Sequence, residues 1–364
     1  MTNAQTIKSA LTSAATLLNT EAASLEAQLL LQHVLNVNRA WLIAHEGDAL
    51  QANKHAVFEA LLKRRLNGEP IAYILGYREF YGLKLKVTAD TLIPRADTET
   101  LVEAALARVP PSPQPSPTGR GSDGQCAEVK NNAAESGSDP LRGNDGDGGS
   151  NNSKCNQSRA PRNLALSSLS LRERAEGEGY NATLLDLGTG TGAIALALAH
   201  NRPQAFVTAT DASVSALKIA QENAQNLGIT NIKFIKSDWF GALQNEKFDM
   251  IVSNPPYIMQ DDIHLKQGDL RFEPLSALAS GAGGLDDIKQ IIAHAPQHLN
   301  PYGWLLLEHG YDQAESVSAL LKSAGFSEIE TVKDLGGNDR VTLGLLQNSN
   351  NILNRHSERS EESS

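Results

Sequence analysis

Apolar residues recur three or four positions apart near residues 27–35 and 58–66, as one face of an amphipathic helix requires. Between these stretches, residues 41–44 indicate a further short helix. No catalytic constellation falls in this part of the chain. The pattern therefore predicts a small helical bundle domain over residues 1–78, whose apolar residues form its own core.

The pattern changes after residue 78. Residues 80–87 alternate between apolar and polar positions as a strand does, and Gly82 marks a bend within them. Residues 97–102 then start a helix with acidic side chains in its first turn. We expect residues 79–109 to form a connecting hairpin and the first helix of a second, larger domain.

Short apolar runs alternate with amphipathic stretches over residues 180–347. The last two runs are joined by residues 334–339 and suit an antiparallel hairpin. This alternation predicts an α/β domain with a doubly wound, seven-stranded sheet of the nucleotide-binding kind. The candidate strands are 183–187, 206–211, 233–237, 250–253, 304–309, 327–333 and 341–346, and the candidate helices between the earlier ones include 216–225 and 287–294.

Two segments lack any such pattern. Residues 110–179 open with closely spaced prolines and continue with Gly, Ser and Asn, so they hold few residues that could form a core. We predict a disordered low-complexity insertion there and a disordered tail over residues 348–364. The chain's 2 cysteines, Cys126 and Cys155, both fall in the insertion. We therefore expect neither a disulfide framework nor a zinc site.

Length and charge narrow the class of protein. A chain of 364 residues can hold two domains. Its net charge of −10 disfavours binding of nucleic acid through a broad basic face. The sequence has no run of about 18 apolar residues, and residues 1–10 lack the pattern of a signal peptide. We expect a soluble cytoplasmic protein that does not act on membranes.

A glycine-rich motif, residues 186–192, follows the first candidate strand and opens a helical stretch at Ala193. Its glycines permit a tight turn and a close approach of a ligand to the backbone. The motif also fits a dinucleotide-binding fingerprint, with Asp211 at a suitable distance for a ribose hydroxyl, and it could be a plain structural turn. The candidate cofactor-binding residues here are Gly188, Thr189, Gly190, Thr191 and Gly192.

Two further residues end the next candidate strands. Asp211 ends the second strand, where a carboxylate can bind a diol or cap the helix that follows. Trp239 follows the third strand, where its ring can pack on a purine or simply belong to the core. Both residues are candidates for holding a nucleotide-like cofactor.

The tetrapeptide Asn254-Pro255-Pro256-Tyr257 follows the fourth candidate strand. The Asn254 side chain offers one carbonyl, and the Pro255 backbone offers another that the next residue cannot bind, because Pro256 has no N–H. The two acceptors can hold both hydrogens of a planar amino group, and the Tyr257 ring can cover its flat face. A dehydrogenase has no use for such a clamp. The motif therefore favours a methyltransferase acting on an amide or exocyclic amine nitrogen, with a structural Pro-Pro turn as the alternative.

Three other polar residues near these motifs are open to interpretation. We expect His309 to be structural, because no second metal ligand lies at a useful spacing from it. Glu273 and Asp286 are expected to shape the far rim of the site, and their roles stay open.

Taken in order along the chain, these motifs closely resemble those of the peptide chain release factor N5-glutamine methyltransferases. The resemblance covers nearly all of the chain outside residues 110–179 and the tail after 347. It implies a class I S-adenosylmethionine-dependent methyltransferase fold, with S-adenosylmethionine as methyl donor and no metal. The motifs that carry it are residues 69–76, 80–82, 92–95, 186–192, 254–257, 272–274 and 339–341.

The same resemblance implies a substrate and roles for the site residues. The acceptor is the glutamine side-chain amide in the Gly-Gly-Gln motif of bacterial class 1 release factors, which are release factors 1 and 2. The bundle over residues 1–78 helps to dock that partner. Apart from the resemblance, we expect a monomer without direct contact with nucleic acid, although the sequence itself does not determine the oligomeric state. The family pattern places Asn254, Pro255 and Tyr257 in catalysis, Pro256 with them in substrate binding, and residues 188–192, Asp211, Trp239 and Asn254 on the cofactor.

Two departures and three alternatives accompany this resemblance. Ala96-Asp97 stands where the family usually has Pro-Glu, and the insertion at 110–179 replaces a short linker. A glutamine methyltransferase for a ribosomal protein, and an rRNA or DNA amino-group methyltransferase, use similar motifs. A remnant that only binds S-adenosylmethionine is the third alternative. Residues 76–95 and the helical bundle favour the release factor.

Overall fold

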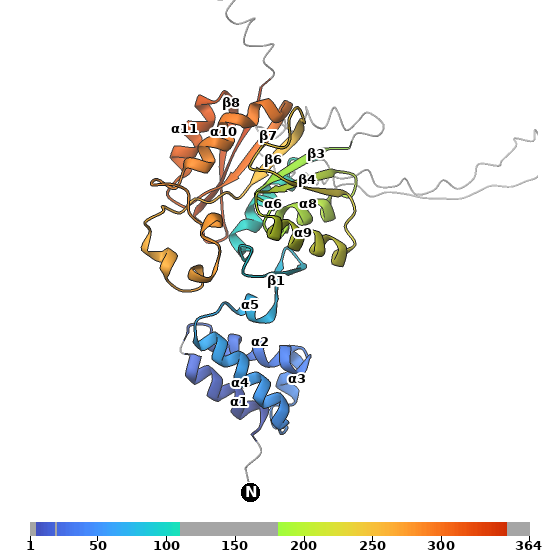
Figure 1. Ribbon diagram of the computed structural model, residues 1–364, viewed down its shortest axis with the longest axis vertical. Coiled ribbons are helices and arrows are strands. Elements are labelled where there is room, and N and C mark those ends of the chain that lie inside the picture. Colours follow the sequence, from blue (N-terminus) through green and yellow to red (C-terminus); the bar gives the residue numbers. More distant parts are fainter. Residues whose placement is uncertain (1–4, 19, 110–180, 348–364) are drawn as a thin grey trace, which may run out of the picture.

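The computed structural model describes residues 5–18, 20–109 and 181–347. The predicted insertion at 110–179 and the predicted tail at 348–364 lie outside the described residues. The described chain forms a small helical domain beside a larger α/β domain, joined by α5 and the β1–β2 hairpin (Figure 1).

The small domain is the helical bundle that the apolar spacing predicts. Its helices bury a shared core that includes Leu30, Leu31 and Phe58. Asn38 caps the third helix, because its side chain accepts a hydrogen bond from the Trp41 amide. The helices are α1 (Ile7–Leu18), α2 (Ala23–Leu35), α3 (Arg39–Ala44), α4 (Ala52–Leu66) and α5 (Ile71–Leu75).

The predicted hairpin is also present. β1 (Tyr77–Phe80) pairs antiparallel with β2 (Leu83–Lys86). Tyr81 and Gly82 both take positive φ angles, 49° and 75°, which closes the turn between the strands. After a short 3₁₀ turn, η1 (Ala96–Thr98), the chain enters α6 (Glu99–Leu106), the helix expected from its acidic first turn.

The large domain contains a seven-stranded sheet in the order β5-β4-β3-β6-β7-β9-β8. Strands β5, β4, β3, β6 and β7 pair in parallel, whereas β9 runs antiparallel between β7 and β8. The predicted strands and the terminal hairpin are confirmed. Their bounds are β3 (Thr183–Leu187), β4 (Phe206–Asp211), β5 (Ile232–Lys236), β6 (Phe248–Ser253), β7 (Leu299–Glu308), β8 (Phe326–Lys333) and β9 (Asp339–Leu346).

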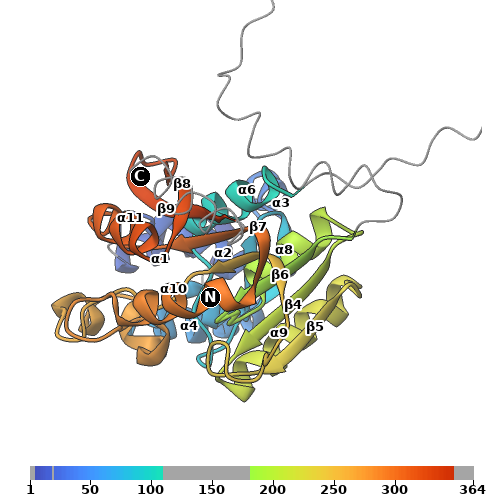
Figure 2. The same ribbon diagram turned by 90° about the horizontal axis from the view of Figure 1, so that it is seen from above.

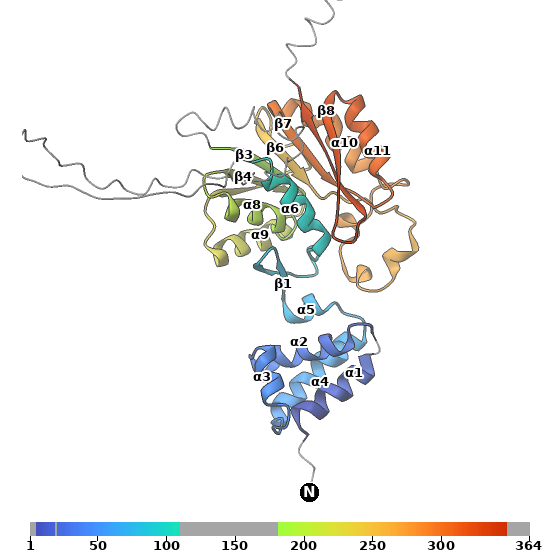
Figure 3. The ribbon, with the colours of Figure 1, turned by 180° about the vertical axis from the view of Figure 1, so that it is seen from behind.

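Helices cover both faces of this sheet, as in a doubly wound fold (Figures 2 and 3). On β3, Leu184 packs with α6 and α8 (Ala193–Asn201), and Leu185 packs on the other face with α10 (Asp286–His298) and α11 (Ala314–Ser323). α9 (Val214–Leu227) lies on the α8 side. The alternation along β3 follows from the period of two in a strand.

The strand order reverses between β3 and β6, which are neighbours in the sheet although β4 and β5 come between them in sequence. In doubly wound sheets, ligands bind at the carboxyl ends of the strands at such a switch point. The long connection from β6 to α10 borders this edge and contains three 3₁₀ turns, η2 (Ile263–Lys266), η3 (Leu270–Phe272) and η4 (Leu275–Ala277).

Candidate active site

A cavity of about 420 Å³ lies at the carboxyl ends of β3, β4, β5 and β6. Most of the motifs singled out from the sequence meet there, together with residues 89–92 and the connection after β6. The lining includes Gly188, Gly190, Asp211, Trp239, Asn254, Pro256, Thr91, Leu92, Pro274 and Asp287.

The glycine-rich turn contributes to the cavity with only part of its length. Gly188 and Gly190 line the wall and have positive φ angles of 71° and 53°. Thr189 and Thr191 are buried behind it. At Gly192, an added Cβ would lie 3.1 Å from the Ala220 Cβ, so this glycine allows α8 and α9 to pack closely. Of the five predicted cofactor-binding residues, Gly188 and Gly190 therefore line the cavity, whereas Thr189, Thr191 and Gly192 shape the turn.

Asp186 begins the motif and holds the turn from inside. Its Oδ2 atom accepts hydrogen bonds from the Thr189 hydroxyl at 2.6 Å and from the Ala195 amide at 3.2 Å. Burial raises the pKa of the Asp186 carboxyl to about 7. The sequence analysis gives this residue no role, although its place at the start of the glycine-rich motif is a signal for one.

Asp211 joins the glycine turn to the start of α9. One carboxylate oxygen accepts from the Gly190 amide at 2.8 Å, and the other accepts from the Ser213 amide at 2.8 Å. Burial raises the pKa of this carboxyl. The helix cap is Ser213, whose hydroxyl accepts from the Ala216 amide at 3.2 Å. The interpretation of Asp211 as the cap is therefore wrong, and its carboxylate faces the cavity.

Trp239 lies over the glycine turn. An added Cβ at Gly188 would lie 3.5 Å from its ring, an ordinary van der Waals distance, so the indole lies directly against the turn. Trp239 also packs on the apolar cluster between the sheet and α10. Its ring thus belongs to the core on one side and to the cavity wall on the other, and Asp238 lines the cavity beside it.

The clamp motif directly follows the buried end of β6. The Asn254 side chain donates from Nδ2 to the Thr98 hydroxyl at 3.2 Å. Within the part of the chain that the structure describes, neither Asn254 Oδ1 nor the Pro255 carbonyl accepts a hydrogen bond. Asn254 and Pro256 line the cavity. Asn254 therefore lies at the cavity wall, whereas Pro255 is buried and is not among the lining residues.

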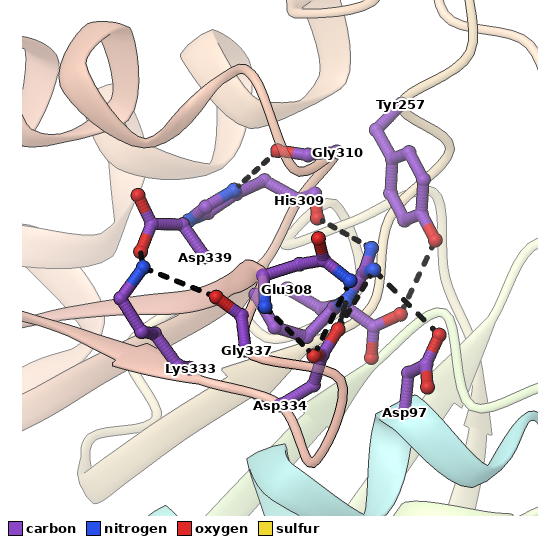
Figure 4. Close-up of polar contacts among 11 residues, drawn as sticks. Asp97, Tyr257, Glu308, His309, Gly310, Lys333, Asp334, Gly337 and Asp339 are labelled. Atoms are coloured by element: carbon purple, nitrogen blue, oxygen red, sulfur yellow. Dashed lines mark hydrogen bonds and ion pairs between the residues drawn. The ribbon is translucent and has the colours of Figure 1, made fainter.

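Tyr257 turns its hydroxyl toward the sheet. The hydroxyl donates to Glu308 Oε1 at 3.3 Å (Figure 4). The Tyr257 backbone carbonyl accepts from the Gln313 side chain at 3.0 Å. Burial raises the pKa of this phenol above its usual range. That the ring covers the substrate amide stays a prediction.

The three residues of open role occupy different positions. Glu273 is buried, accepts from the Ile93 amide at 2.9 Å and pairs with Arg95, which ties residues 92–95 to the rim after β6. Asp286 is exposed at the start of α10 and pairs with Lys289 at 3.2 Å. The His309 ring is buried between the Thr342 hydroxyl, at 2.7 Å, and the Gly310 carbonyl, at 2.8 Å, as suits a structural role.

Two properties of the described residues bear on other classes of function. Residues 5–18, 20–109 and 181–347 contain no group of three or more His, Cys, Asp or Glu side chains placed to hold a metal ion. Over the same ranges, none of the helices combines the length and the apolar character needed to cross a membrane.

The strand order, the glycine turn after β3 and the Asn-Pro-Pro-Tyr after β6 together define a class I methyltransferase. Residues 9–76 match the family model of the PrmC N-terminal domain, and residues 167–269 match that of the methyltransferase small domain. The chain is 42% identical over 319 residues to a protein of Xylella fastidiosa (strain Temecula1) named "Release factor glutamine methyltransferase", covering 88% of this chain and 92% of that one.

Proteins of the same name from two other bacteria are similar to this chain to nearly the same degree. The Pseudomonas aeruginosa protein is 40% identical over 322 residues, covering 88% of this chain and 92% of that one. The Escherichia coli (strain K12) protein is 40% identical over 319 residues, covering 88% and 91%. The chain therefore belongs to the release factor glutamine methyltransferase family.

Proposed function

We propose that this protein transfers a methyl group from S-adenosylmethionine to the side-chain amide nitrogen (N5) of the glutamine in the Gly-Gly-Gln motif of bacterial release factors 1 and 2. The observation that carries the proposal is the pair of carbonyl acceptors after β6, Asn254 Oδ1 on a cavity-lining residue and the backbone carbonyl of the adjacent Pro255, which the described residues leave without hydrogen-bond donors. Membership of the family supports the choice of substrate.

The cavity fits an adenosyl cofactor. Each Asp211 oxygen accepts one backbone amide and keeps a lone pair for a ribose hydroxyl. The Trp239 ring offers a flat face for a purine, and Gly188 and Gly190 expose backbone without side chains. The bound cofactor would supply a methyl group on a positively charged sulfur. No metal takes part in this chemistry.

The clamp would make the amide nitrogen of the substrate, which is a poor nucleophile, more reactive by orienting it. An amide nitrogen delocalises its lone pair into its carbonyl group. If the two N–H groups donate to Asn254 Oδ1 and to the Pro255 carbonyl, the nitrogen is turned toward the methyl group and its pyramidal form is favoured. Each such hydrogen bond contributes about 1–3 kcal/mol in a site that excludes water. The N–C bond forms as the sulfur–carbon bond breaks, and one N–H proton leaves to water.

The helical bundle over residues 1–78 would dock the release factor. Arg65 links the bundle to the connection between β6 and α10, since it pairs with Glu26 at 2.8 Å and with Asp269 at 2.9 Å. Arg271 on the same connection donates to the Asn67 carbonyl at 3.0 Å. A partner docked on the bundle would thus lie beside the connection that follows the clamp. We propose that a cytoplasmic monomer does this without contacting nucleic acid.

A substrate panel tests the proposal. The full chain would be incubated with tritiated S-adenosylmethionine and, separately, with unmethylated release factors 1 and 2, ribosomal proteins, rRNA and DNA. We expect label in both release factors and none in a release factor that carries Gly-Gly-Glu. Label in a ribosomal protein or in nucleic acid, with none in the release factors, would overturn the assignment.

A further inference from the structure

The hairpin that joins the two domains leads directly into a wall of the cavity. β2 ends at Lys86, and residues 89–92, a few positions later, line the cavity. Residues 87–92 form neither helix nor strand. Contacts with other parts of the chain must therefore hold residues 86–92, the wall segment, in place.

Asn223 on α9 holds the start of the wall segment. Its Oδ1 atom accepts from the Lys86 amide at 2.7 Å, and its Nδ2 atom donates to the Lys86 carbonyl at 3.1 Å. Nδ2 also donates to the Thr191 carbonyl in the glycine-rich turn at 2.9 Å. The amide of one side chain therefore ties the wall segment to the glycine-rich turn, which contributes Gly188 and Gly190 to the same cavity.

These hydrogen bonds serve the cavity walls and not the helix. Asn223 is only 1% exposed, and a buried amide is costly unless its hydrogen bonds are satisfied. An Asn inside a helix is also less favourable than an Ala. Its side-chain partners are Lys86 and Thr191, both outside α9. Because the Lys86 amide can only donate and the two carbonyls can only accept, the orientation of the Asn223 side chain is fixed.

Tyr73 on α5 holds the other end of the wall segment. Its hydroxyl donates to the Thr91 carbonyl at 2.6 Å, and its ring packs on a buried cluster that includes Val87. The Thr91 amide and hydroxyl both donate to the Thr88 carbonyl, at 3.1 and 3.2 Å, which closes a turn within the segment. The wall segment is thus fixed near both ends by residues from two different helices.

We propose that Asn223 and Tyr73 are positioning residues for the cofactor, which hold the wall segment in the arrangement that S-adenosylmethionine binds. Neither residue lines the cavity, so both act through the backbone of residues that do. The inference rests on the proposed function, because it takes S-adenosylmethionine as the ligand of the cavity.

Loss of either anchor lowers the affinity for the cofactor. Without its hydrogen bonds, the wall segment adopts other arrangements, and the cofactor binds the fraction of molecules in which the wall is formed. The apparent dissociation constant rises in inverse proportion to that fraction. A wall that is formed in about one molecule in ten thus binds the cofactor about tenfold more weakly.

The test is the dissociation constant of S-adenosylmethionine, measured by calorimetry on the full chain without a methyl acceptor. Asn223→Leu keeps the approximate size of the side chain but leaves the Lys86 amide and two carbonyls without their partner. The constant should rise about tenfold or more. Tyr73→Phe removes a single hydroxyl group and should raise the constant about threefold. This milder variant provides the test if Asn223→Leu fails to fold.

Two controls separate positioning from loss of stability. Glu222→Gln, next to Asn223 on α9, breaks a partly exposed pair with the Lys86 side chain, so the affinity should stay within about twofold of wild type. Leu321→Ala leaves a cavity in the core under α11. It should lower the midpoint of thermal unfolding and leave the affinity unchanged.

Amide hydrogen exchange of the cofactor-free protein gives a second readout that does not depend on the cofactor. In Asn223→Leu, exchange should become faster over residues 86–92. In Leu321→Ala, faster exchange should fall around α11 and not on the wall segment.

The outcomes distinguish this inference from the proposed function. A wild-type dissociation constant in a folded Asn223→Leu or in Tyr73→Phe, or an equal loss of affinity in Leu321→Ala, would overturn the positioning role and leave the proposed function standing. A wild-type protein that binds no S-adenosylmethionine would overturn the proposed function and this inference with it.

Discussion

At the scale of single residues, Asn254 carries the largest share of the proposed chemistry. Asn254→Ala removes one clamp acceptor while it leaves Asp211 and Trp239 in the cavity wall. We expect methyl transfer to fall by about 10- to 100-fold, the equivalent of one hydrogen bond of about 1–3 kcal/mol. The affinity for S-adenosylmethionine should stay within about twofold. Single-turnover kinetics and calorimetry measure the two quantities.

A matched control for this substitution is Asn245→Ala, at an exposed asparagine in the turn before β6. It should leave both rate and affinity unchanged. Wild-type turnover in Asn254→Ala would refute the clamp.

Asp186 makes stability depend on pH in an unusual direction. Its pKa is raised from 3.8 to about 7, so the folded state keeps a proton that the unfolded state has lost across this range. Stability from this residue is therefore greatest below pH 3.8 and falls as pH rises to about 7. Relative to wild type, Asp186→Asn should gain free energy of unfolding through that window and then level off. Urea unfolding at several pH values measures this, and a constant difference would contradict it.

Individual site residues could be predicted from the sequence where they directly follow a strand. Gly188, Asp211, Trp239 and Asn254 each follow an apolar run, and the topology brings them to one edge. Thr98 was not predictable, since its contact with Asn254 joins residues 156 positions apart. The same holds for Glu308, which lies 51 positions from Tyr257 and inside an apolar run. No local pattern marks such pairs.

At the scale of elements, Glu273 fastens two walls of the cavity. Glu273 lies on the connection after β6. Its carboxylate accepts from the Ile93 backbone amide and pairs with the Arg95 side chain. Glu273→Leu would leave the Ile93 amide without a hydrogen-bond acceptor, which typically costs about 1–3 kcal/mol. The Arg95 guanidinium is 36% exposed, so water can replace its lost partner. We expect a lower midpoint of thermal unfolding and weaker cofactor binding, measured by calorimetry. Glu315→Leu, at an exposed glutamate of α11, is the control. Equal stability of the two variants would contradict the anchoring role.

The elements themselves were largely predictable because strands of this sheet are continuous apolar runs. β3 and β4 match the expected bounds, whereas β7 begins at Leu299, five positions before the apolar run at Trp304. Residues 299–303 include Pro301 and Gly303. Both residue types are uncommon inside strands, so the sequence does not predict this part of β7. The helical stretches predicted from the sequence do not include α11, although its Val317 and Leu321 are buried at helical spacing.

At the scale of the whole molecule, the described contacts secure α6 to the rest of the large domain. Arg202 donates to the Leu106 carbonyl at 2.6 Å and to the Val109 carbonyl at 3.2 Å, directly before the insertion. We therefore expect replacement of residues 111–179 by a short Gly-Ser linker to leave the unfolding midpoint within about 3 °C and turnover within about threefold, because loop-closure free energy changes by only about 0.6 kcal/mol per twofold change in length. Loss of folding would contradict this.

The most direct test of the whole account is to find where the methyl group goes. The purified full chain would be incubated with S-adenosylmethionine carrying a deuterated methyl group and with unmethylated release factor, and the product mapped by peptide mass spectrometry. The account predicts a single added methyl on the glutamine side chain of the Gly-Gly-Gln motif, reduced in Asn254→Ala. A methyl group on another residue, or none on the release factor, would contradict it.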